Sequence, residues 1–303
     1  MAKVKFPDGS ILENADGTTA YQFAEQIGSR LAQAALGAKI DGRITDLSTP
    51  ISGETTLQII TARDREGLDI LRHSCAHIMA EAICTLWPDA KLVYGPTVED
   101  GFYYDIDLDE PIRPEDFEKI EKEMARIVKA DQPFVRIEMK RHEALEKMAG
   151  DPYKLDNINR ATGDIISFYR QGDGFEDLCR GPHIPRTGSI DPKAFKVMSV
   201  AGAYWHGDAS QKMLQRVYGT VWPSKKDLQV YLERIEEAKK RDHRLIGKQM
   251  DLFSFHEEGP GFAFLHPKGM ILWNEIIDFW RQVHKKYGYS EVKTPIILNE
   301  SLW

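Results

Sequence analysis

Two pairs of side chains with the same spacing are the strongest candidates for chemistry in this sequence. His73 and His77 lie four residues apart in HSCAH, and Cys179 and His183 repeat that spacing in CRGPH. We call these four residues the quartet. Imidazole nitrogens and a thiolate suit tetrahedral Zn²⁺, and the same groups without a metal can orient a water molecule and move protons near neutral pH. The pattern predicts a functional site and leaves both chemistries open.

Two familiar catalytic arrangements fit the quartet poorly. A zinc protease of the HExxH type needs a glutamate directly after its first histidine, and Ser74 follows His73 here. A nucleophilic Cys179 activated by His183 needs a lowered thiol pKa, whereas a neighbouring Asp177 favours the protonated thiol. We therefore interpret Cys179 as a pocket wall or a ligand before a nucleophile.

Other side chains offer binding chemistry, and each has a plainer alternative. Lys154 can stabilise a developing oxyanion or bind phosphate, although a lone lysine usually faces solvent. The aromatic candidates for stacking on a base or a ribose are Tyr103, Tyr104, Tyr204 and Trp205. Such side chains more often pack on half-buried strands, so the residues themselves leave both roles open.

Helical periodicity places the first pair of the quartet. Apolar residues recur at helical spacing over 71–86, which puts His73, His77 and Glu81 together on a neighbouring stripe. Pro88 ends this helix. The two histidines therefore lie on one face of one helix, and the second pair has to come from another segment.

Turn signals and changes of pattern divide the chain into four segments. They are a small α+β unit over 1–62, a larger α+β domain over 63–224, a connecting helix over 225–242 with a basic tail to 248, and a last segment over 243–303. In the first segment, Thr18 or Thr19 caps a helix that begins at Ala20. In the last segment, a helix over 271–284 precedes a strand over 292–298.

Composition limits the class of protein. The 303 residues are 42% hydrophobic and 29% charged, which is typical of a globular protein with more than one domain. No apolar run approaches the roughly 20 residues of a membrane helix, so no membrane partner is expected. Three cysteines without a CxxC pair, and an N-terminus without an apolar signal, favour a reducing cytoplasm. A net charge of −7 argues against general coating of nucleic acid and leaves local basic faces possible.

Over all 303 residues, the chain resembles the N-terminal part of the bacterial threonyl-tRNA synthetase family. The resemblance rests on RHSCAH at 72–77, GFYYD at 101–105, LCRGPH at 178–183, AGAYW at 201–205, MLQRVYGT at 213–220 and KRDHRLIGKQMDLF at 240–253. It implies that 1–62 is a TGS domain with a ubiquitin-like β-grasp fold and that 63–224 is the editing domain. It also implies that 243–303 is the truncated start of a class II aminoacylation core, with motif 1 at 268–298 and its proline at Pro295.

The resemblance implies a threonine–tRNA ligase fragment that retains the editing half and hydrolyses Ser-tRNA(Thr). Such a site is needed because losing one methyl group is worth only about 1–3 kcal/mol, so a threonine site rejects serine weakly. The family's ATP-binding motifs 2 and 3, its zinc ligands for threonine and its anticodon domain are not in this sequence, which stops in mid-element. We therefore expect editing and no aminoacylation from this chain.

By resemblance, the quartet lines the editing site beside Tyr104, Lys154, Asp177, Tyr204 and Trp205. His73 and Lys154 are expected to hold the attacking water, Asp177 to help seat the ammonium of the amino acid, and the pocket to exclude the extra methyl group of threonine. His206 stands where the family usually has arginine, which puts an RNA contact at this position in doubt.

The resemblance also implies cofactors and partners. We expect no tightly bound metal in this chain, and zinc in the quartet is the alternative because the related alanyl editing domain holds zinc in a similar set. Zinc and ATP with Mg²⁺ belong to the full-length parent. The expected partners are tRNA(Thr), mischarged Ser-tRNA and a second copy joined through the motif 1 region. The rival interpretations are a free-standing zinc-dependent aminoacyl-tRNA deacylase and a non-catalytic RNA-binding module.

Overall fold

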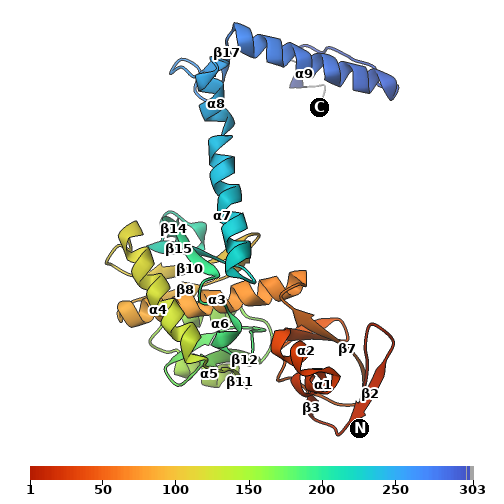
Figure 1. Cartoon of the computed structure of the whole chain (residues 1–303). Coiled ribbons are helices and arrows are strands. Elements are labelled where there is room, and N and C mark those ends of the chain that lie inside the picture. The colour runs from red at the N-terminus through yellow and green to blue at the C-terminus, as the bar shows by residue number, and fades with distance from the viewer. Residues whose placement is uncertain (298, 301–303) are drawn as a thin grey trace. The chain divides into compact units, whose positions relative to one another are not determined.

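The computed structural model describes residues 1–297 and 299–300 (Figure 1). Their contacts divide the chain into two compact units, Met1–Val230 and Tyr231–Trp303. Each unit combines helices with strands, so the predicted mixed α+β architecture is confirmed. Among the described residues, no helix has the length and apolar character needed to cross a membrane.

The first sheet lies at the N-terminus. Its strands, in the order β2-β1-β7-β4-β5, are Ile11–Asn14, Ala2–Lys5, Glu54–Thr61, Ala35–Ile40 and Arg43–Thr45, and β1 pairs with β7 in parallel. The short strands β3 (Thr18–Thr19) and β6 (Pro50–Ile51) pair with each other, and the helices are α1 (Ala20–Ile27) and α2 (Ser29–Ala34). Thr19 caps α1, because its side chain accepts a hydrogen bond from the Gln22 amide, as predicted. The arrangement is consistent with the β-grasp fold that the resemblance implies.

The long helix α3 (Arg65–Leu86) follows β7 directly and forms the centre of the largest apolar core. It packs against α4 (Phe117–Ala130) and β10 (Gly101–Asp107), as Figure 1 shows. Its core stripe includes Leu71, Cys75, Ile78 and Ile83, all almost fully buried. The helix ends at Trp87, directly before Pro88, so the predicted helix and its end are confirmed.

Close packing at the start of α3 predicts that replacing Gly67 destabilises the fold. A Cβ added to Gly67 would lie 1.8 Å from the Thr61 carbonyl oxygen, which is backbone and cannot swing away. Gly67→Ala is therefore expected to lower the free energy of unfolding by about 1–3 kcal/mol, measured by urea denaturation. Gly150→Ala is the matched control, because nothing lies within 4 Å of a Cβ there. Equal stability of the two variants would contradict the packing argument.

Two further sheets and their helices complete the first unit. One sheet has the order β14-β15-β10-β8, with strands Phe195–Tyr204, Met213–Val221, Gly101–Asp107 and Lys91–Tyr94, and β9 (Thr97–Val98) pairs with β10. The other has the order β11-β12-β13, with strands Phe134–Lys140, Ile165–Gln171 and Phe175–Leu178. The helices α5 (Arg141–Lys147) and α6 (Pro152–Arg160) lie between β11 and β12 in sequence. The strand predicted near 98–108 is thus β10, preceded by the short β9.

The second unit begins within α7 (Lys225–Lys240), where the connecting helix was predicted. The basic tail does not extend this helix but forms a separate one, α8 (His243–Gln249). The helical backbone is interrupted at Asp242, and the side chain of Asp242 caps the new helix. The strands β16 (Phe253–Ser254) and β17 (Phe264–Leu265) pair, and α9 (Pro267–Lys286) follows. This helix extends beyond both ends of the predicted range.

The strand predicted over 292–298 is wrong for the residues that the structure describes. Residues 292–297 form no strand, and the side chains of Val292, Ile296 and Ile297 are exposed. A strand needs a neighbour for its backbone hydrogen bonds, and no described segment pairs with this one. Leu298 and Ser301–Trp303 lie outside the described residues. The assignment of 243–303 to a class II core stays a prediction.

Candidate functional site

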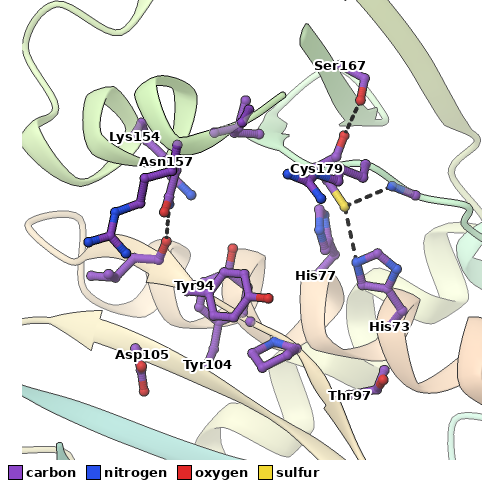
Figure 2. Close-up of a pocket in the computed structure, with 18 of the residues that line it drawn as sticks. His73, His77, Tyr94, Thr97, Tyr104, Asp105, Lys154, Asn157, Ser167 and Cys179 are labelled. Carbon is purple, nitrogen blue, oxygen red and sulfur yellow. Dashed lines mark hydrogen bonds between the residues drawn. The ribbon is translucent and has the colours of Figure 1, made fainter. Parts of the chain in front are cut away.

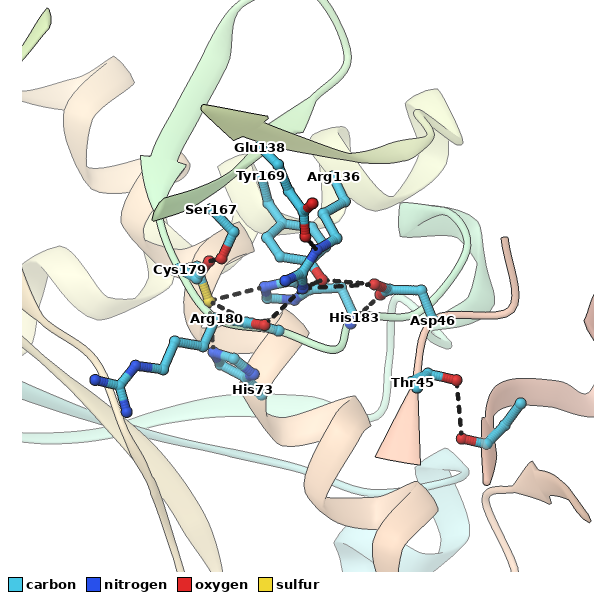
Figure 3. A network of polar contacts seen from close by, with 12 residues as sticks. Thr45, Asp46, His73, Arg136, Glu138, Ser167, Tyr169, Cys179, Arg180 and His183 are labelled. Carbon is cyan, nitrogen blue, oxygen red and sulfur yellow. Dashed lines mark hydrogen bonds and ion pairs between the residues drawn. The ribbon is translucent and has the colours of Figure 1, made fainter. Parts of the chain in front are cut away.

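The fold brings the four members of the quartet together (Figures 2 and 3). His73 and His77 come from α3, whereas Cys179 and His183 come from the loop after β13. The Cys179 Sγ atom lies 3.1 Å from His73 Nε2 and 3.3 Å from His183 Nε2. One potential ligand atom from each residue lies within 4.8 Å of the other three. The equal spacing in sequence therefore corresponds to one compact cluster in space.

Neighbouring side chains fix the orientation of His183. Phe134 stacks on its ring with centroids 4.9 Å apart, and Ser74 Oγ lies 3.1 Å from its Nδ1. The Ser74 hydroxyl donates to the Ile70 carbonyl and accepts from the Ile184 amide, so His183 Nδ1 has to be the donor to Ser74. The neutral ring then carries its lone pair on Nε2, which faces Cys179.

Burial keeps the quartet in its uncharged form. It lowers the pKa of His77 to about 3 and places the pKa of His73 and of His183 below the usual range. Burial also raises the pKa of the Cys179 thiol to about 12, and Asp177 adds to this effect. The predicted direction of the Asp177 effect is thus confirmed. At neutral pH the site holds three neutral imidazoles and a protonated thiol, which is not an activated nucleophile.

These pKa shifts predict that acid destabilises the fold. In the unfolded chain a histidine titrates near 6.5, so between pH 7 and pH 4 the unfolded state takes up protons that the folded site does not bind. The free energy of unfolding should fall as the pH falls, by about 3 kcal/mol at pH 4 from His77 alone. Urea denaturation from pH 7 to pH 4 measures this slope. It should be shallower in His77→Gln than in the wild type.

A buried ion pair adjoins the quartet. Lys154 Nζ lies 2.5 Å from Asp177 Oδ1, and both side chains are almost fully buried. Tyr104 donates its hydroxyl proton to the other carboxylate oxygen, and the Leu178 amide donates to Oδ1. Burial, the largest single effect, would by itself raise the pKa of Asp177, but the contacts with Lys154, His77 and Tyr104 together outweigh it and the pKa lies below the usual range. Lys154 is thus a buried partner of a carboxylate and does not face solvent.

The start of α6 holds Lys154 in place. Asp151 is the N-cap of this helix, and its side chain accepts from the amides of Tyr153 and Lys154. Pro152 occupies the first turn, where its missing N–H costs nothing. Tyr153 is buried and donates its hydroxyl proton to Asp107. The sequence Asp-Pro-Tyr-Lys therefore fixes a helix start that carries one cation into the protein interior.

Three members of the quartet border a cavity of about 1090 Å³. His73, His77, Cys179, Lys154 and Tyr104 line this cavity (Figure 2). Tyr204 and Trp205 line it as well. His183 and Asp177 do not line it, because they lie behind the residues that do. Asp177 has both oxygens engaged by protein groups, so its position does not favour direct contact with a substrate.

The segment 204–207 borders the same cavity. Trp205 packs edge-on against Tyr153 with centroids 5.0 Å apart and stacks on His206 at 4.6 Å. His206 Nε2 lies 3.1 Å from Asp156 Oδ2 on α6. His206, for which an RNA contact was in doubt, therefore faces a carboxylate of the protein itself, that of Asp156.

Sequence reasoning missed a residue from the N-terminal sheet that reaches the quartet. Asp46 follows β5, and its Oδ1 atom accepts from the His183 amide at 2.9 Å. Its Oδ2 atom accepts from the Tyr169 hydroxyl at 2.6 Å, and Arg136 donates to that same hydroxyl (Figure 3). In sequence Asp46 is an ordinary turn residue, and no pattern around it signals contact with His183 and Tyr169, which lie more than a hundred residues further along the chain.

The domain content defines the class of protein. Residues 2–61 match the TGS domain family, and residues 166–218 match the family described as the threonyl and alanyl tRNA synthetase second additional domain. The chain therefore carries a TGS domain together with an additional domain of aminoacyl-tRNA synthetases.

Similarity to curated proteins narrows this class to one family. Over 306 residues, the chain is 52% identical to the threonine–tRNA ligase of Desulforamulus reducens and 51% identical to that of Acetivibrio thermocellus. It is 47% identical over 307 residues to the threonine–tRNA ligase of Thiobacillus denitrificans. Each match covers 100% of this chain and 48% of the relative. The chain belongs to the threonyl-tRNA synthetase family and spans about half the length of these curated relatives.

Proposed function

We propose that the first unit of this chain hydrolyses the ester of serine misattached to threonine tRNA. The observation that carries this proposal is the pairing of a neutral His/Cys quartet with a buried lysine on the wall of one large cavity. The match of 166–218 to the synthetase additional domain supports it, because this segment contributes β12, β13 and the quartet loop. The TGS domain is consistent with an RNA substrate.

The proposed reaction adds water to the ester carbonyl. The water oxygen bonds to the carbonyl carbon, the ester bond to the ribose oxygen breaks, and the products are serine and tRNA with a free hydroxyl. His73 lines the cavity and accepts a hydrogen bond from the water, while the ammonium of Lys154 stabilises the oxyanion. Because burial lowers the pKa of His73, this imidazole is a weak base, and the neighbouring ribose hydroxyl of the substrate relays a proton to the leaving oxygen.

Asp177 is proposed to act through Lys154. Its two oxygens are held by Lys154, Tyr104 and the Leu178 amide, so it fixes the direction in which the ammonium points. Since Asp177 does not line the cavity, this role fits its position better than a direct hold on the substrate ammonium. Tyr204 and Trp205 line the cavity and are proposed to contact the nucleoside end of the substrate.

A zinc-dependent deacylase is the second candidate, and the donor set favours it. Zinc binds nitrogen at about 2.0–2.1 Å and sulfur at about 2.3 Å, so its tetrahedral donors lie about 3.5 Å apart. The donors of the quartet lie within 4.8 Å of one another and would have to draw slightly closer around the ion. His77 Nδ1 is buried and has no hydrogen-bond partner among the described residues. His73, His77, Cys179 and His183 would be the ligands, and a bound zinc would supply a Lewis acid at the cavity wall. We nevertheless expect metal-free hydrolysis.

The deciding measurement is hydrolysis of Ser-tRNA and Thr-tRNA, both on threonine tRNA, by the purified chain with and without a zinc chelator. Fast loss of serine that resists the chelator, with threonine spared, is the expected result. Loss that the chelator abolishes would establish the zinc site. If neither ester is hydrolysed, both the metal-free and the zinc-dependent hydrolase are contradicted, and a non-catalytic RNA-binding module is favoured.

The full-length parent is proposed to attach threonine to tRNA(Thr) with ATP and Mg²⁺ in the cytoplasm, using zinc held outside this chain. We further propose that parent copies dimerise through the motif 1 region at 268–298, and that these 303 residues alone do not aminoacylate. Aminoacylation by the purified chain would contradict the last proposal, and a monomeric parent in sedimentation experiments would contradict the dimer.

A further inference from the structure

Cationic side chains gather around the cavity, and nearly all of them are already neutralised. The cations that line it are Arg136, Lys154, Arg160, Arg180 and Arg216. Four of these have a carboxylate partner within ion-pair distance: Glu138 at 2.9 Å, Asp177 at 2.5 Å, Asp156 at 3.2 Å and Asp105 at 2.6 Å, respectively. Within residues 1–297 and 299–300, Arg180 has no such partner. Its positive charge is therefore the one on the cavity wall that an anion can still use.

The backbone of the quartet loop fixes where Arg180 sits. Its carbonyl accepts from Arg136 Nη1 at 2.8 Å, and the preceding Cys179 amide donates to the Ser167 carbonyl at 3.1 Å. Cys179 directs its sulfur toward His73, whereas Figure 3 shows the Arg180 side chain extending away from both of these residues. A held loop thus presents a thiol to the reaction site and an exposed guanidinium beside it.

We propose that Arg180 binds the phosphodiester that joins the last two nucleotides of the tRNA substrate. The inference rests on the proposed function, because an aminoacyl ester on a terminal ribose brings that phosphate close to the reacting carbonyl. A guanidinium presents paired N–H donors that match phosphate oxygens. Among the described residues, the other four cations that line this wall already have carboxylate partners. Arg180 is a positioning residue, since it holds the 3′ end while the quartet and Lys154 meet the ester.

The test compares substrates with and without the phosphate. Arg180→Gln is assayed on Ser-tRNA(Thr) and on a seryl ester of adenosine that has no phosphate. On Ser-tRNA, the half-saturating concentration should rise about tenfold with the maximum rate within about twofold. The dependence of substrate binding on salt concentration should also weaken, by the amount expected for the loss of about one phosphate contact. On seryl-adenosine, the variant and the wild type should behave alike. Arg180→Lys should recover part of the affinity, because it restores the charge without the paired donors.

Arg170→Gln is the matched control. Arg170 lies on β12, is exposed, has no carboxylate partner among the described residues and does not line the cavity. Its replacement should leave both substrates within about twofold of the wild type. Equal losses in the Arg170 and Arg180 variants, or a loss on seryl-adenosine as large as on Ser-tRNA, would overturn the proposal.

Failure of the proposed function is separately visible. If the wild-type chain hydrolyses neither ester, the binding of uncharged tRNA(Thr) still tests Arg180 through the dissociation constants of the wild type, Arg180→Gln and Arg170→Gln. A loss of tRNA affinity in Arg180→Gln but not in Arg170→Gln would support the phosphate contact even though the chain shows no hydrolysis. Unchanged tRNA affinity in Arg180→Gln would contradict the proposed phosphate contact. Circular dichroism and thermal melting check that each variant is folded. Among the described residues, the Arg180 side chain has no hydrogen bond or ion pair whose loss would destabilise the fold.

Discussion

Replacement of His73 by alanine is expected to lower the maximum rate of Ser-tRNA hydrolysis by about 10²–10⁴-fold with little change in tRNA affinity. His73 is the histidine of the quartet that both lines the cavity and contacts Cys179 Sγ, at 3.1 Å. Removing its ring removes the group proposed to hold the water, whereas it removes no cation that can bind the tRNA backbone. Single-turnover hydrolysis and equilibrium tRNA binding measure the two quantities separately.

Two controls make the His73 result specific. His142→Ala changes an exposed histidine on α5 and should leave the rate unchanged. His73→Gln keeps a hydrogen-bonding side chain of similar length and should retain more activity than alanine does. A pure RNA-binding module has no turnover to lose. If the wild type and His73→Ala both lack hydrolysis and bind tRNA equally, the catalytic role of His73 is contradicted.

The sequence predicted those parts of the site that depend on local periodicity. The apolar stripe of α3 fixed the face on which His73 and His77 lie, because burial of that stripe leaves the helix only one orientation. The matching spacing of Cys179 and His183 suggested that the second pair faces the first. Such patterns are visible because they repeat within one turn or one short loop.

The remaining features of the site depend on contacts between distant segments, which no local pattern encodes. The burial of Lys154 follows from its pairing with Asp177 across two elements, and the tautomer of His183, in the quartet loop, follows from Ser74 on α3. A lysine and a serine of this kind look like ordinary surface residues in sequence. The wrong strand at 292–298 has the same origin, since apolar β-branched residues predict a strand only where a partner strand is available.

Replacement of Asp46 by alanine is the second variant with a large expected effect. Asp46 links the N-terminal sheet to the quartet loop by accepting from the His183 amide and the Tyr169 hydroxyl. Without the carboxylate, the amide, the hydroxyl and the Arg136 guanidinium near it lose an acceptor, and the loop that carries Cys179 is less well held. A misplacement near 1 Å can cost about 100-fold in rate, so we expect hydrolysis to slow by about 10–100-fold.

A change in rate without a general loss of folding is what distinguishes positioning by Asp46 from a purely structural role. Asp8→Ala is the matched control, because Asp8 is also a carboxylate of the N-terminal domain but, among the described residues, accepts hydrogen bonds only from Ser10 within its own turn. Asp46→Asn keeps an oxygen acceptor and should lie between alanine and the wild type. If Asp46→Ala and Asp8→Ala retain equal hydrolysis rates at a temperature where both are folded, the N-terminal sheet does not position the quartet, and residues 63–224 should hydrolyse Ser-tRNA as well without it.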